Sequence, residues 1–519
     1  MPVTTSVAAS IIPKYALAMS AEPIFRIPTL RLTAANTHAV RGGGRYVLYW
    51  MTGARRTTWN FALQRAVEWA AHLKRPLVVF EPLRCGYRWA CDRFHAFVLQ
   101  GMADNAAACA TAKVTYLPYV EDAPGNGRGL LAHLASEACI VIGDDYPGFF
   151  LPHMIAAAAK TLPVRLEIVD GNGLLPLRAT TVASATAYAF RRVLQKTLRP
   201  HLDAMPLAEP LATAPRLTKP NLPNGWGSRW HAPEPSLFVG STATLATLPI
   251  NHAVGVVGMR GGAHAATQRL TAFLASGLDR YHEKRNDVED GAASGLSPWL
   301  HFGHLSAHQA VATVLARESW SPQRLGSKAD GKRDGWWGVA SGPENFLDEL
   351  VTWRELGHHY CFHRPAHESW EDLPNWARAT LETHAQDPRE HVYTLEQFAD
   401  ARTHDPLWNA AQRELRQTGR MHNYLRMLWG KKVLEWTRHP REALAILTEL
   451  NNRYAVDGRD PNSSSGISWC LGRFDRPWAP QRPIFGQIRY MSSASTLKKI
   501  KLRGYLERYG ETSGQQTLF

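Results

Sequence analysis

Between residues 46 and 170, short apolar runs alternate with longer stretches of helical periodicity. The apolar runs read YVLYWM, PLVVFEPL, KVTYLP, CIVIGDDY and VRLEIVD. Such short, nearly continuous apolar runs are typical of strands that are buried on both faces. The intervening stretches, such as RRTTWNFALQRAVEWAAHLKR, place apolar residues at the spacing of an amphipathic helix. This alternation predicts an α/β domain with a parallel sheet covered by helices on both faces.

The predicted α/β domain carries no catalytic signature of its own. The triple glycine at residues 42–44 precedes a predicted strand, whereas a dinucleotide-binding glycine loop follows one. The GxxxxGK(S/T) loop that holds nucleoside triphosphates is also missing from the sequence. We therefore expect the chemistry in the second half of the chain.

The pattern changes near residue 200, where proline begins to recur and strand-like runs end. Helical patterns follow, and 14 of the 18 tryptophans lie at or after Trp226. We divide the chain into an α/β domain at 26–176, a connector with a helix and a proline-rich stretch at 177–250, and an all-helical domain at 251–510. Residues 1–25 are expected to be a disordered extension rather than a transit peptide, and residues 511–519 a short tail.

Composition narrows the choice of partners and excludes several scaffold classes. The formal net charge of +14 favours a polyanionic partner, with nucleic acid ahead of an anionic membrane surface. The six cysteines contain no CxxC pair, which fits a reducing cytoplasm and argues against zinc-ribbon, iron–sulfur and disulfide scaffolds. No apolar run approaches the roughly 20 residues that cross a bilayer. The histidines of HHYCFH match no standard ligand spacing, so no metal site is predicted.

Two segments of the second half carry candidate carboxylates. In ENFLDELVTWRELGHHY, helical spacing puts Glu349 and Trp353 one turn apart on one face. In a polar cavity the indole would stack a flat ring while the carboxylate bonds its edge, but a surface glutamate beside a core tryptophan gives the same pattern. In NNRYAVDGRDPNSSSG, Asp457 and Asp460 flank Arg459 in a rigid turn. That turn either accepts a cofactor N–H group or is architecture only.

Two further features suit a cofactor. Ser294 and Ser297 precede a predicted helix, whose free N–H groups would hold a phosphate, although an ordinary helix cap explains the serines equally well. Trp429 and Trp436 are seven residues apart, two helical turns or about 10 Å. Trp408 lies on the preceding segment, which a turn at Gly419 would fold back. Three indoles so placed would relay an electron from a buried redox centre to solvent, and core packing is the alternative.

Taken together, these segments resemble the photolyase/cryptochrome flavoproteins, most closely the class II cyclobutane pyrimidine dimer photolyases. The similarity runs from about residue 44 to 510 and includes RNDVEDGAASGLSPWLHFGHLS, THDPLWNAAQRE, GRMHNYLRMLWGKKVLEW, LNNRYAVDGRDPN and IFGQIRYM. It implies a Rossmann-like antenna domain followed by an all-α FAD-binding domain. It also implies light-dependent repair of pyrimidine dimers in double-stranded DNA, with an electron passing from photoexcited reduced FAD to a flipped-out dimer. A cryptochrome-like blue-light photoreceptor without repair activity is the alternative.

The resemblance assigns roles to individual residues. Glu349 would bond the base edge, and Trp353 and Trp469 would pack against the two thymines, with Met427 nearby. Asn451 would face flavin N5. The residues implied in binding FAD are Tyr281, Ser294, Gly295, Leu296, Ser297, Arg354, Asn451, Asp457 and Asp460. Trp429, Trp408 and Trp436 match the set that delivers electrons to FAD, with Trp429 nearest the flavin. The residues implied in DNA binding are Arg420, Arg426, Arg476, Arg489, Lys498 and Lys499.

Further expectations concern surfaces and a second chromophore. The basic residues interleaved with the tryptophans, Lys431 and Lys432 among them, are expected to help form a DNA-facing surface. In many relatives an antenna chromophore of the deazaflavin or folate type lies in the N-terminal domain, and the sequence names no ligands for it. The chain departs from the class pattern at GRFDRPW, where Phe474 replaces histidine, and in the loop that follows. We expect a monomer in the cytoplasm, associated with the nucleoid through DNA.

Overall fold

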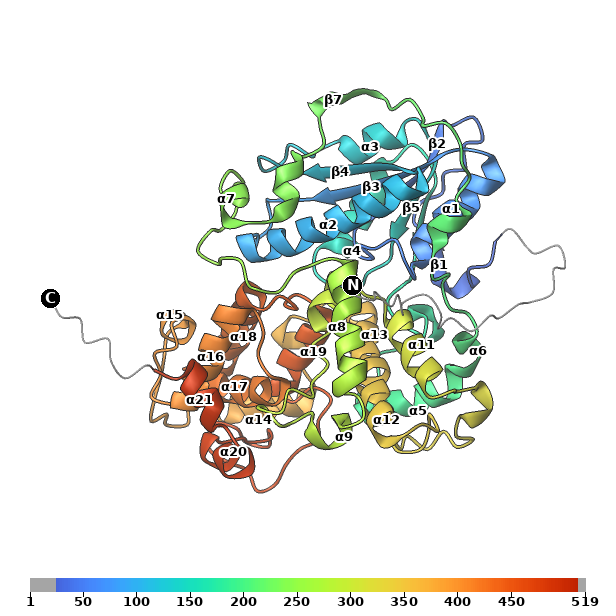
Figure 1. The fold of residues 1–519 in the computed structure, drawn as a ribbon. Helices are drawn as coiled ribbons and strands as arrows, with labels where there is room; N and C mark the ends of the chain where they lie inside the picture. The colour runs from blue at the N-terminus through green and yellow to red at the C-terminus, as the bar shows by residue number, and fades with distance from the viewer. Residues whose placement is uncertain (1–24, 512–519) are drawn as a thin grey trace, which may run out of the picture.

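The computed structural model describes residues 25–511, which form a sheet domain stacked on a helical half (Figure 1). The expectations for residues 1–25 and 511–519 lie outside this range, apart from Phe25 and Glu511. In the described residues no helix is long and apolar enough to cross a membrane.

The sheet has six strands in the order β1-β6-β5-β2-β3-β4. The strands are β1 (Leu32–Ala34), β2 (Tyr46–Trp50), β3 (Leu77–Leu83), β4 (Thr115–Val120), β5 (Ala138–Asp144) and β6 (Leu166–Val169). All five predicted strands are present and pair in parallel. The short edge strand β1 pairs antiparallel with β6 and was not predicted. Every residue of β2 and β5 is buried, which explains their unbroken apolar sequences.

Helices cover both faces of the sheet. The covering helices are α1 (Phe61–Leu73), α2 (Asp92–Ala112), α3 (Leu130–Ala135) and α4 (Leu151–Thr161). The apolar side chains of α1 pack with Val47 and Tyr49 on one face, and those of α3 pack with Leu48 and Trp50 on the other. Because successive strand residues point to opposite faces, each strand contributes to both cores.

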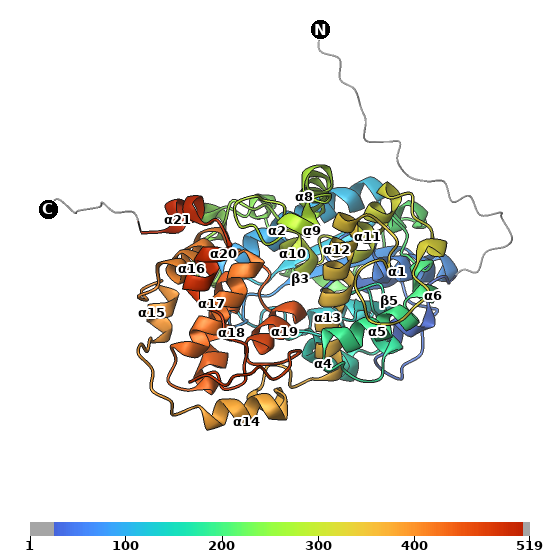
Figure 2. The same ribbon diagram turned by 90° about the horizontal axis from the view of Figure 1, so that it is seen from below.

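The connector and the helical half form two lobes, each with its own hydrophobic core. The first lobe contains α5 (Ala187–Thr197), α6 (Arg199–Leu202), α8 (Ala263–Ser276), α9 (Tyr281–Lys284), α10 (Ser297–His301), α11 (Ala307–Arg317), α12 (Ser341–Leu347), the π-helical turn η6 (Asp348–Trp353) and α13 (Arg354–His363). The second contains α14 (Asn375–Thr383), α15 (Leu395–Ala399), α16 (Pro406–Thr418), α17 (Asn423–Glu435), α18 (Pro440–Tyr454), α19 (Pro461–Cys470), α20 (Ser493–Lys499) and α21 (Arg503–Tyr509). Figure 2 shows the lobes side by side, with α13 and α19 at their boundary.

Shorter elements complete the fold. They are the 3₁₀ turns η1 (Thr29–Arg31), η2 (Leu177–Ala179), η3 (Pro210–Thr213), η4 (Pro235–Val239), η5 (Pro322–Arg324) and η7 (Trp370–Asp372), with β7 (Asn224–Trp230) and α7 (Thr242–Leu245) in the connector. Gly357 lets α13 approach α19 closely, since a Cβ there would come within 2.8 Å of the Asn462 side-chain oxygen.

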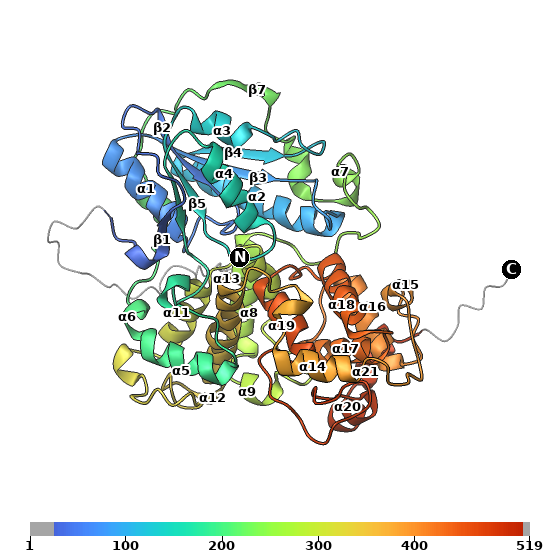
Figure 3. The same cartoon turned by 180° about the vertical axis from the view of Figure 1, so that it is seen from behind.

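Arg93 of α2 fixes the sheet domain to the second lobe. Figure 3 shows the sheet domain with α2 above the second lobe with α16 and α18. The Arg93 guanidinium donates to the carbonyl oxygens of Leu415, Arg416 and Tyr454 at 3.2, 2.5 and 2.5 Å. These carbonyls lie in the last turns of α16 and α18, and that of Leu415 also accepts from the Gly419 N–H at 3.0 Å. One side chain therefore joins the two halves of the molecule.

Candidate functional site at the lobe boundary

Glu349 and Trp353 lie in η6, a π-helical turn between α12 and α13. Such turns are rare and frequently occur at functional sites. The Glu349 carboxylate forms an ion pair with Arg285, and the Trp353 indole is 37% exposed. Burial raises the pKa of Glu349, while the Arg285 charge opposes that rise. The turn thus presents a partly buried carboxylate and an open indole close together.

Trp469, at the end of α19, packs against both hydrophobic cores of the helical half. Glu349 and Trp353 belong to the first lobe, whereas Met427 on α17 belongs to the second and is half-buried. The groups assigned to the dimer thus come from both sides of one boundary, although they lie far apart in sequence.

Three arginines, Arg269, Arg420 and Arg426, form a cluster at this boundary beside the loop that precedes α10. Arg269 donates to the carbonyl oxygens of Ala293 and Ser294 at 2.8 and 2.7 Å. Gly295 has a φ of +66°, and a Cβ there would come within 2.7 Å of Nη2 of Arg420. In the described part of the chain the Arg420 guanidinium has neither a hydrogen bond nor an ion pair, and burial lowers its pKa. A half-buried guanidinium without a partner suits an anion such as a diphosphate.

Other residues assigned to FAD lie on α18 and in the turn after it, on α9 and at the start of α10. Asp457 accepts two hydrogen bonds from Arg426, at 3.0 and 3.3 Å. Asn451 is buried on α18, where its amide donates to the Asn452 side chain at 3.0 Å. Tyr281 and Leu296 are buried and Ser297 is exposed at the start of α10. The DNA contacts assigned to Arg420 and Arg426 stay predictions.

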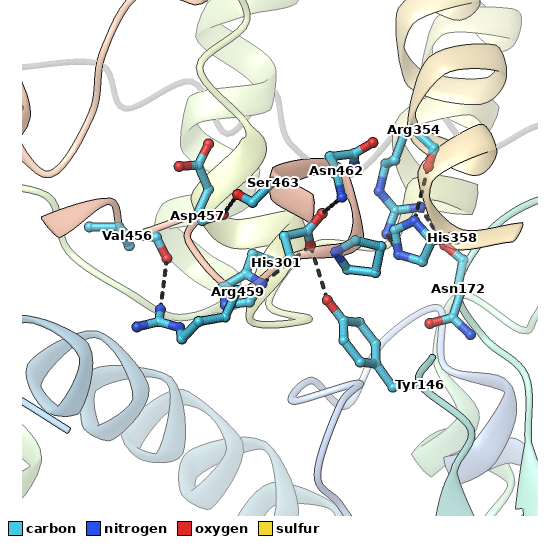
Figure 4. A network of polar contacts seen from close by, with 12 residues as sticks. Tyr146, Asn172, His301, Arg354, His358, Val456, Asp457, Arg459, Asn462 and Ser463 are labelled. Atoms are coloured by element: carbon cyan, nitrogen blue, oxygen red, sulfur yellow. Dashed lines mark hydrogen bonds and ion pairs between the residues drawn. The ribbon is translucent and has the colours of Figure 1, made fainter. Parts of the chain in front are cut away.

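Arg354 and Asp460 belong to a different group, a polar network between the helical half and the sheet domain (Figure 4). Asp460 accepts from the Tyr146 hydroxyl at 3.0 Å and from the backbone of Asn462 at 2.8 Å, and its carboxylate lies 3.2 Å from His301. Arg354 donates to the carbonyl of Asn172 at 2.5 Å. Burial alone would raise the pKa of Asp460, but the His301 hydrogen bond and the Arg354 charge hold it well below its ordinary value. These contacts tie the two domains together.

The three tryptophans of the predicted relay lie in contact. Trp408 stacks on Trp429 with ring centroids 6.2 Å apart and meets Trp436 edge-on, also at 6.2 Å. The Trp408 indole N–H donates to the Trp429 carbonyl at 3.1 Å, and the Trp429 N–H donates to Gln412 at 3.0 Å. All three are buried in the core of the second lobe. The three tryptophans therefore pack in the core and also form a continuous chain of aromatic contacts, so the two interpretations of the sequence do not exclude each other.

The basic residues beside these tryptophans do not behave as expected. Lys431 is fully buried and Lys432 is 6% exposed, so the prediction that they help form a DNA-facing surface is wrong. Lys431 donates to backbone carbonyls, and Lys432 pairs with Glu435 at 2.6 Å. Their long stems reach inward to partners that the sequence does not reveal.

Basic residues are exposed elsewhere, on the segment from α19 to α20. These are Arg476, Arg489, Lys498 and Lys499, all assigned to DNA from the sequence. The guanidinium groups of Arg476 and Arg489 lie 5.0 and 5.1 Å from the Trp478 ring. Arg489 also lies 5.9 Å from the Trp469 ring, so the basic rim continues to the lobe boundary. Trp478 was not predicted, although tryptophan in a loop rich in arginine was an available signal.

The histidines of HHYCFH serve the packing of η2 against α13. The Thr180 hydroxyl lies 2.8 Å from both His359 and His363. Across residues 25–511 no group of three or more His, Cys, Asp and Glu side chains is arranged to hold a metal ion.

A cavity lies between the sheet domain and the helical half, beside the carboxyl ends of β2, β3 and β5. The cavity is open to solvent, and its space together with that solvent amounts to about 770 Å³. Its aromatic lining comes from Tyr87, Tyr146, Phe149, Phe150 and Phe302, and its basic lining includes Arg55, Arg84 and Arg459. Ligands of open α/β sheets commonly bind at this edge.

Several known proteins are similar to this chain in sequence. Residues 346–434 match the family model described as the FAD binding domain of DNA photolyase. A deoxyribodipyrimidine photo-lyase from Methanothermobacter thermautotrophicus is 33% identical over 471 residues, covering 90% of this chain and 94% of that protein. Its counterpart from Oryza sativa is 32% identical over 491 residues, covering 91% of this chain and 90% of that protein.

The chain belongs to the deoxyribodipyrimidine photo-lyase family. This photolyase is a DNA-repair lyase and a flavoprotein that binds FAD. The fold agrees, since a class III photolyase from Agrobacterium tumefaciens superposes with a TM-score of 0.64 at 18% identity, covering 90% of this chain and 86% of that one. A cryptochrome from Synechocystis gives a TM-score of 0.63 at 16% identity, covering 89% and 88%. The photolyase sequence thus folds as an α/β domain with an all-helical FAD-binding half, as predicted.

The described residues fit the cofactor. The matched segment 346–434 contains η6, the tryptophans Trp408 and Trp429, and the arginines of the cluster on the second lobe. Arg420 supplies a free guanidinium beside a glycine whose missing side chain leaves room for it. Sequence reasoning missed Arg285 as the partner of Glu349, because the two residues are 64 positions apart.

Proposed function

We propose that this photolyase repairs cyclobutane pyrimidine dimers in double-stranded DNA, as a class II enzyme, with a dimer flipped out of the duplex into the lobe boundary. FAD, when bound, reduced and excited by light, supplies the electron that splits the cyclobutane ring. One observation carries the proposal. The partly buried carboxylate of Glu349 and the exposed indole of Trp353 lie on η6, in the first lobe, and Trp469 packs against the cores of both lobes. A flipped pyrimidine needs a flat apolar wall and a polar group for its edge.

Glu349 recognises the base edge in this proposal. Its carboxylate is partly buried and held by Arg285, so it is desolvated before the dimer arrives. A hydrogen bond to a charged group contributes about 1.5–3 kcal/mol, and more where water is excluded. In its protonated form, which burial favours, the Glu349 carboxyl group donates a hydrogen bond to the dimer edge and so stabilises the negative charge that develops there.

Trp353 and Trp469 form the apolar walls of the site, with Met427 filling the space beside them. Trp353 is exposed enough to accept a ring, and Trp469 is half-buried against both cores. Stacking on an aromatic side chain contributes about 1–3 kcal/mol per base. The walls exclude water and orient the dimer relative to the cofactor.

The arginine cluster holds the cofactor. Arg420 and the backbone at Gly295 bind the FAD diphosphate, while the Arg426–Asp457 pair and Asn451 lie toward the flavin. Tyr281, Ser294, Leu296 and Ser297 complete the first-lobe side. This gives Arg420 a role in FAD binding in place of the DNA contact predicted from the sequence, supported by its unpartnered guanidinium.

The tryptophan chain delivers electrons that reduce the cofactor. Contacts from Trp429 through Trp408 to Trp436 support this assignment, because adjacent rings in a buried chain couple well. Arg476, Arg489, Lys498 and Lys499 bind DNA phosphates and give affinity without sequence preference. The aromatic and basic cavity beside β2, β3 and β5 is our candidate site for an antenna chromophore.

The proposal is tested with reduced, purified protein and an oligonucleotide that carries one thymine dimer. Under blue light, the thymine absorbance should return, and it should not return in the dark. Glu349→Gln should lower the yield roughly 10- to 100-fold while FAD stays bound. Glu283→Gln, at an exposed position of α9, is the matched control and should repair normally.

Two outcomes would contradict the proposal. If FAD binds but no dimer is repaired under light, the protein is better described as a cryptochrome-like photoreceptor. If Glu349→Gln loses FAD instead of repair, Glu349 belongs to the cofactor site rather than to the dimer site.

A further inference from the structure

Lys431 of α17 is the least expected basic residue in the molecule. Its side chain is fully buried, and its Nζ donates to the carbonyl oxygen of Cys470 at 2.7 Å and to that of Trp469 at 3.4 Å. Both carbonyls lie at the C-terminal end of α19, and that of Trp469 also accepts from the Gly472 N–H at 3.1 Å. The same Nζ lies 4.7 Å from the centroid of the Trp469 ring.

This charge has no counter-ion. Within residues 25–511, no carboxylate lies within ion-pairing distance of Lys431, whereas its neighbour Lys432 is paired with Glu435 at 2.6 Å. Burying a cation without an opposite charge is expensive, and an apolar side chain of the same length would cost less. A lysine at this position therefore points to a role beyond folding.

We propose that Lys431 is a positioning residue of the dimer site. Its ammonium fixes the end of α19 and the Trp469 indole against which the dimer packs. Its uncompensated charge also favours the negative charge that the dimer acquires on accepting an electron. This inference rests on the proposed function through the role of Trp469 and through the charge on the dimer; the contacts of Lys431 are independent of it.

The groups that face the ammonium set its titration. Burial lowers the pKa of Lys431 to about 8, the Asp475 carboxylate favours the charged form and the Arg489 guanidinium opposes it. Burial raises the pKa of the Cys470 thiol, and the Lys431 charge opposes that rise. Lys431 is therefore charged below about pH 8 and becomes a neutral amine above it, which weakens its hold on Trp469.

The first test reads Trp469 without any photochemistry. The holoprotein is labelled with 5-fluorotryptophan, and the Trp469 fluorine signal is assigned with Trp469→Phe. That signal should titrate near pH 8 in the parent protein, stay fixed in Lys431→Met, and titrate only at higher pH in Lys431→Arg. A signal that does not titrate, or that titrates equally in Lys431→Met, overturns the proposal whether or not dimers are repaired.

The second test reads the reaction. Lys431→Met should lower repair about tenfold, the loss of one charge-assisted hydrogen bond, and should abolish the fall in repair that the parent shows above about pH 8. Lys431→Arg should restore repair across that range. Lys160→Met removes one exposed charge from α4 and controls for the change in net charge.

The outcomes separate the positioning role of Lys431 from the proposed role of Trp469 in the dimer site. Suppose that the fluorine signal titrates but that Lys431→Met and Trp469→Phe both repair normally. The inference is then overturned, because Trp469 has no part in dimer binding. Normal repair by Lys431→Met alone overturns it because Trp469 then needs no support from Lys431. If Lys431→Met does not fold, the parent titration and the Lys431→Arg variant still decide the matter.

Discussion

Gly295 offers a sharp test of how the photolyase holds FAD. Its φ of +66° and its contact with Arg420 give Gly295→Ala two separate consequences. An alanine in this backbone conformation costs about 1–2 kcal/mol of stability. The new Cβ would also lie within 2.7 Å of Nη2 of Arg420, which must move aside. Since that atom ends a flexible side chain, its movement costs little in folding but removes it from the proposed diphosphate site.

Gly291 in the same loop provides the matched control. Its φ is +73° and no atom lies within 4 Å of the position that a Cβ would take, so Gly291→Ala carries the backbone cost alone. Both variants should lose about 1–2 kcal/mol of unfolding free energy. Only Gly295→Ala should also lose a charge-assisted hydrogen bond to FAD, about 1.5–3 kcal/mol or roughly 10- to 150-fold in affinity.

The assay is titration of the FAD-free protein with FAD, followed by flavin fluorescence, together with chemical denaturation of each variant. In an Arg420→Ala background, Gly295→Ala should cause no further loss of FAD affinity, because the two changes act through one contact. Equal loss of FAD in Gly291→Ala and Gly295→Ala would refute the reasoning, since backbone strain would then account for the whole effect.

Three further predictions follow from the contacts described above. Trp408→Phe should block light-driven reduction of the cofactor but leave repair by chemically reduced protein intact, and should cost about 2 kcal/mol of stability through the smaller ring and the lost N–H bond. Asp460→Asn should lower the unfolding free energy by about 3 kcal/mol at pH 7. Because Asp460 has a lowered pKa when folded, its contribution is present above about pH 4 and is lost as the pH falls, so the difference between variant and parent should shrink in acid denaturation. Arg476→Ala and Lys498→Ala should each weaken binding to damaged and undamaged DNA alike. Each should also reduce the slope of log affinity against log salt concentration by about one, measured by fluorescence anisotropy.

The sheet was predictable because its strands are buried on both faces, so that each apolar run stands out from its helical neighbours. β1 was missed because three residues, only partly buried, leave no such pattern. The pairing of Glu349 and Trp353 was predicted from helical spacing, but the wider π-helical turn that carries them has no signal in the sequence. Of the basic residues that we expect on a DNA-facing surface, some are exposed and others are buried. Lys431 and Lys498 look alike in a sequence, and only the three-dimensional partners show that the first is buried and the second exposed.

The two lobes divide the work of the proposed reaction in a way that follows from their cores. The tryptophan chain lies wholly within the core of the second lobe, while the carboxylate and indole of η6 belong to the first. The contact of Arg420 with Gly295 crosses the boundary and is assigned here to the cofactor. Residues in separate cores with no shared partner contribute independently to stability and activity. The route that reduces FAD can therefore change without disturbing Glu349 and Trp353, whereas Met427 shares α17 with Trp429 and Trp469 packs against the core of the tryptophan chain.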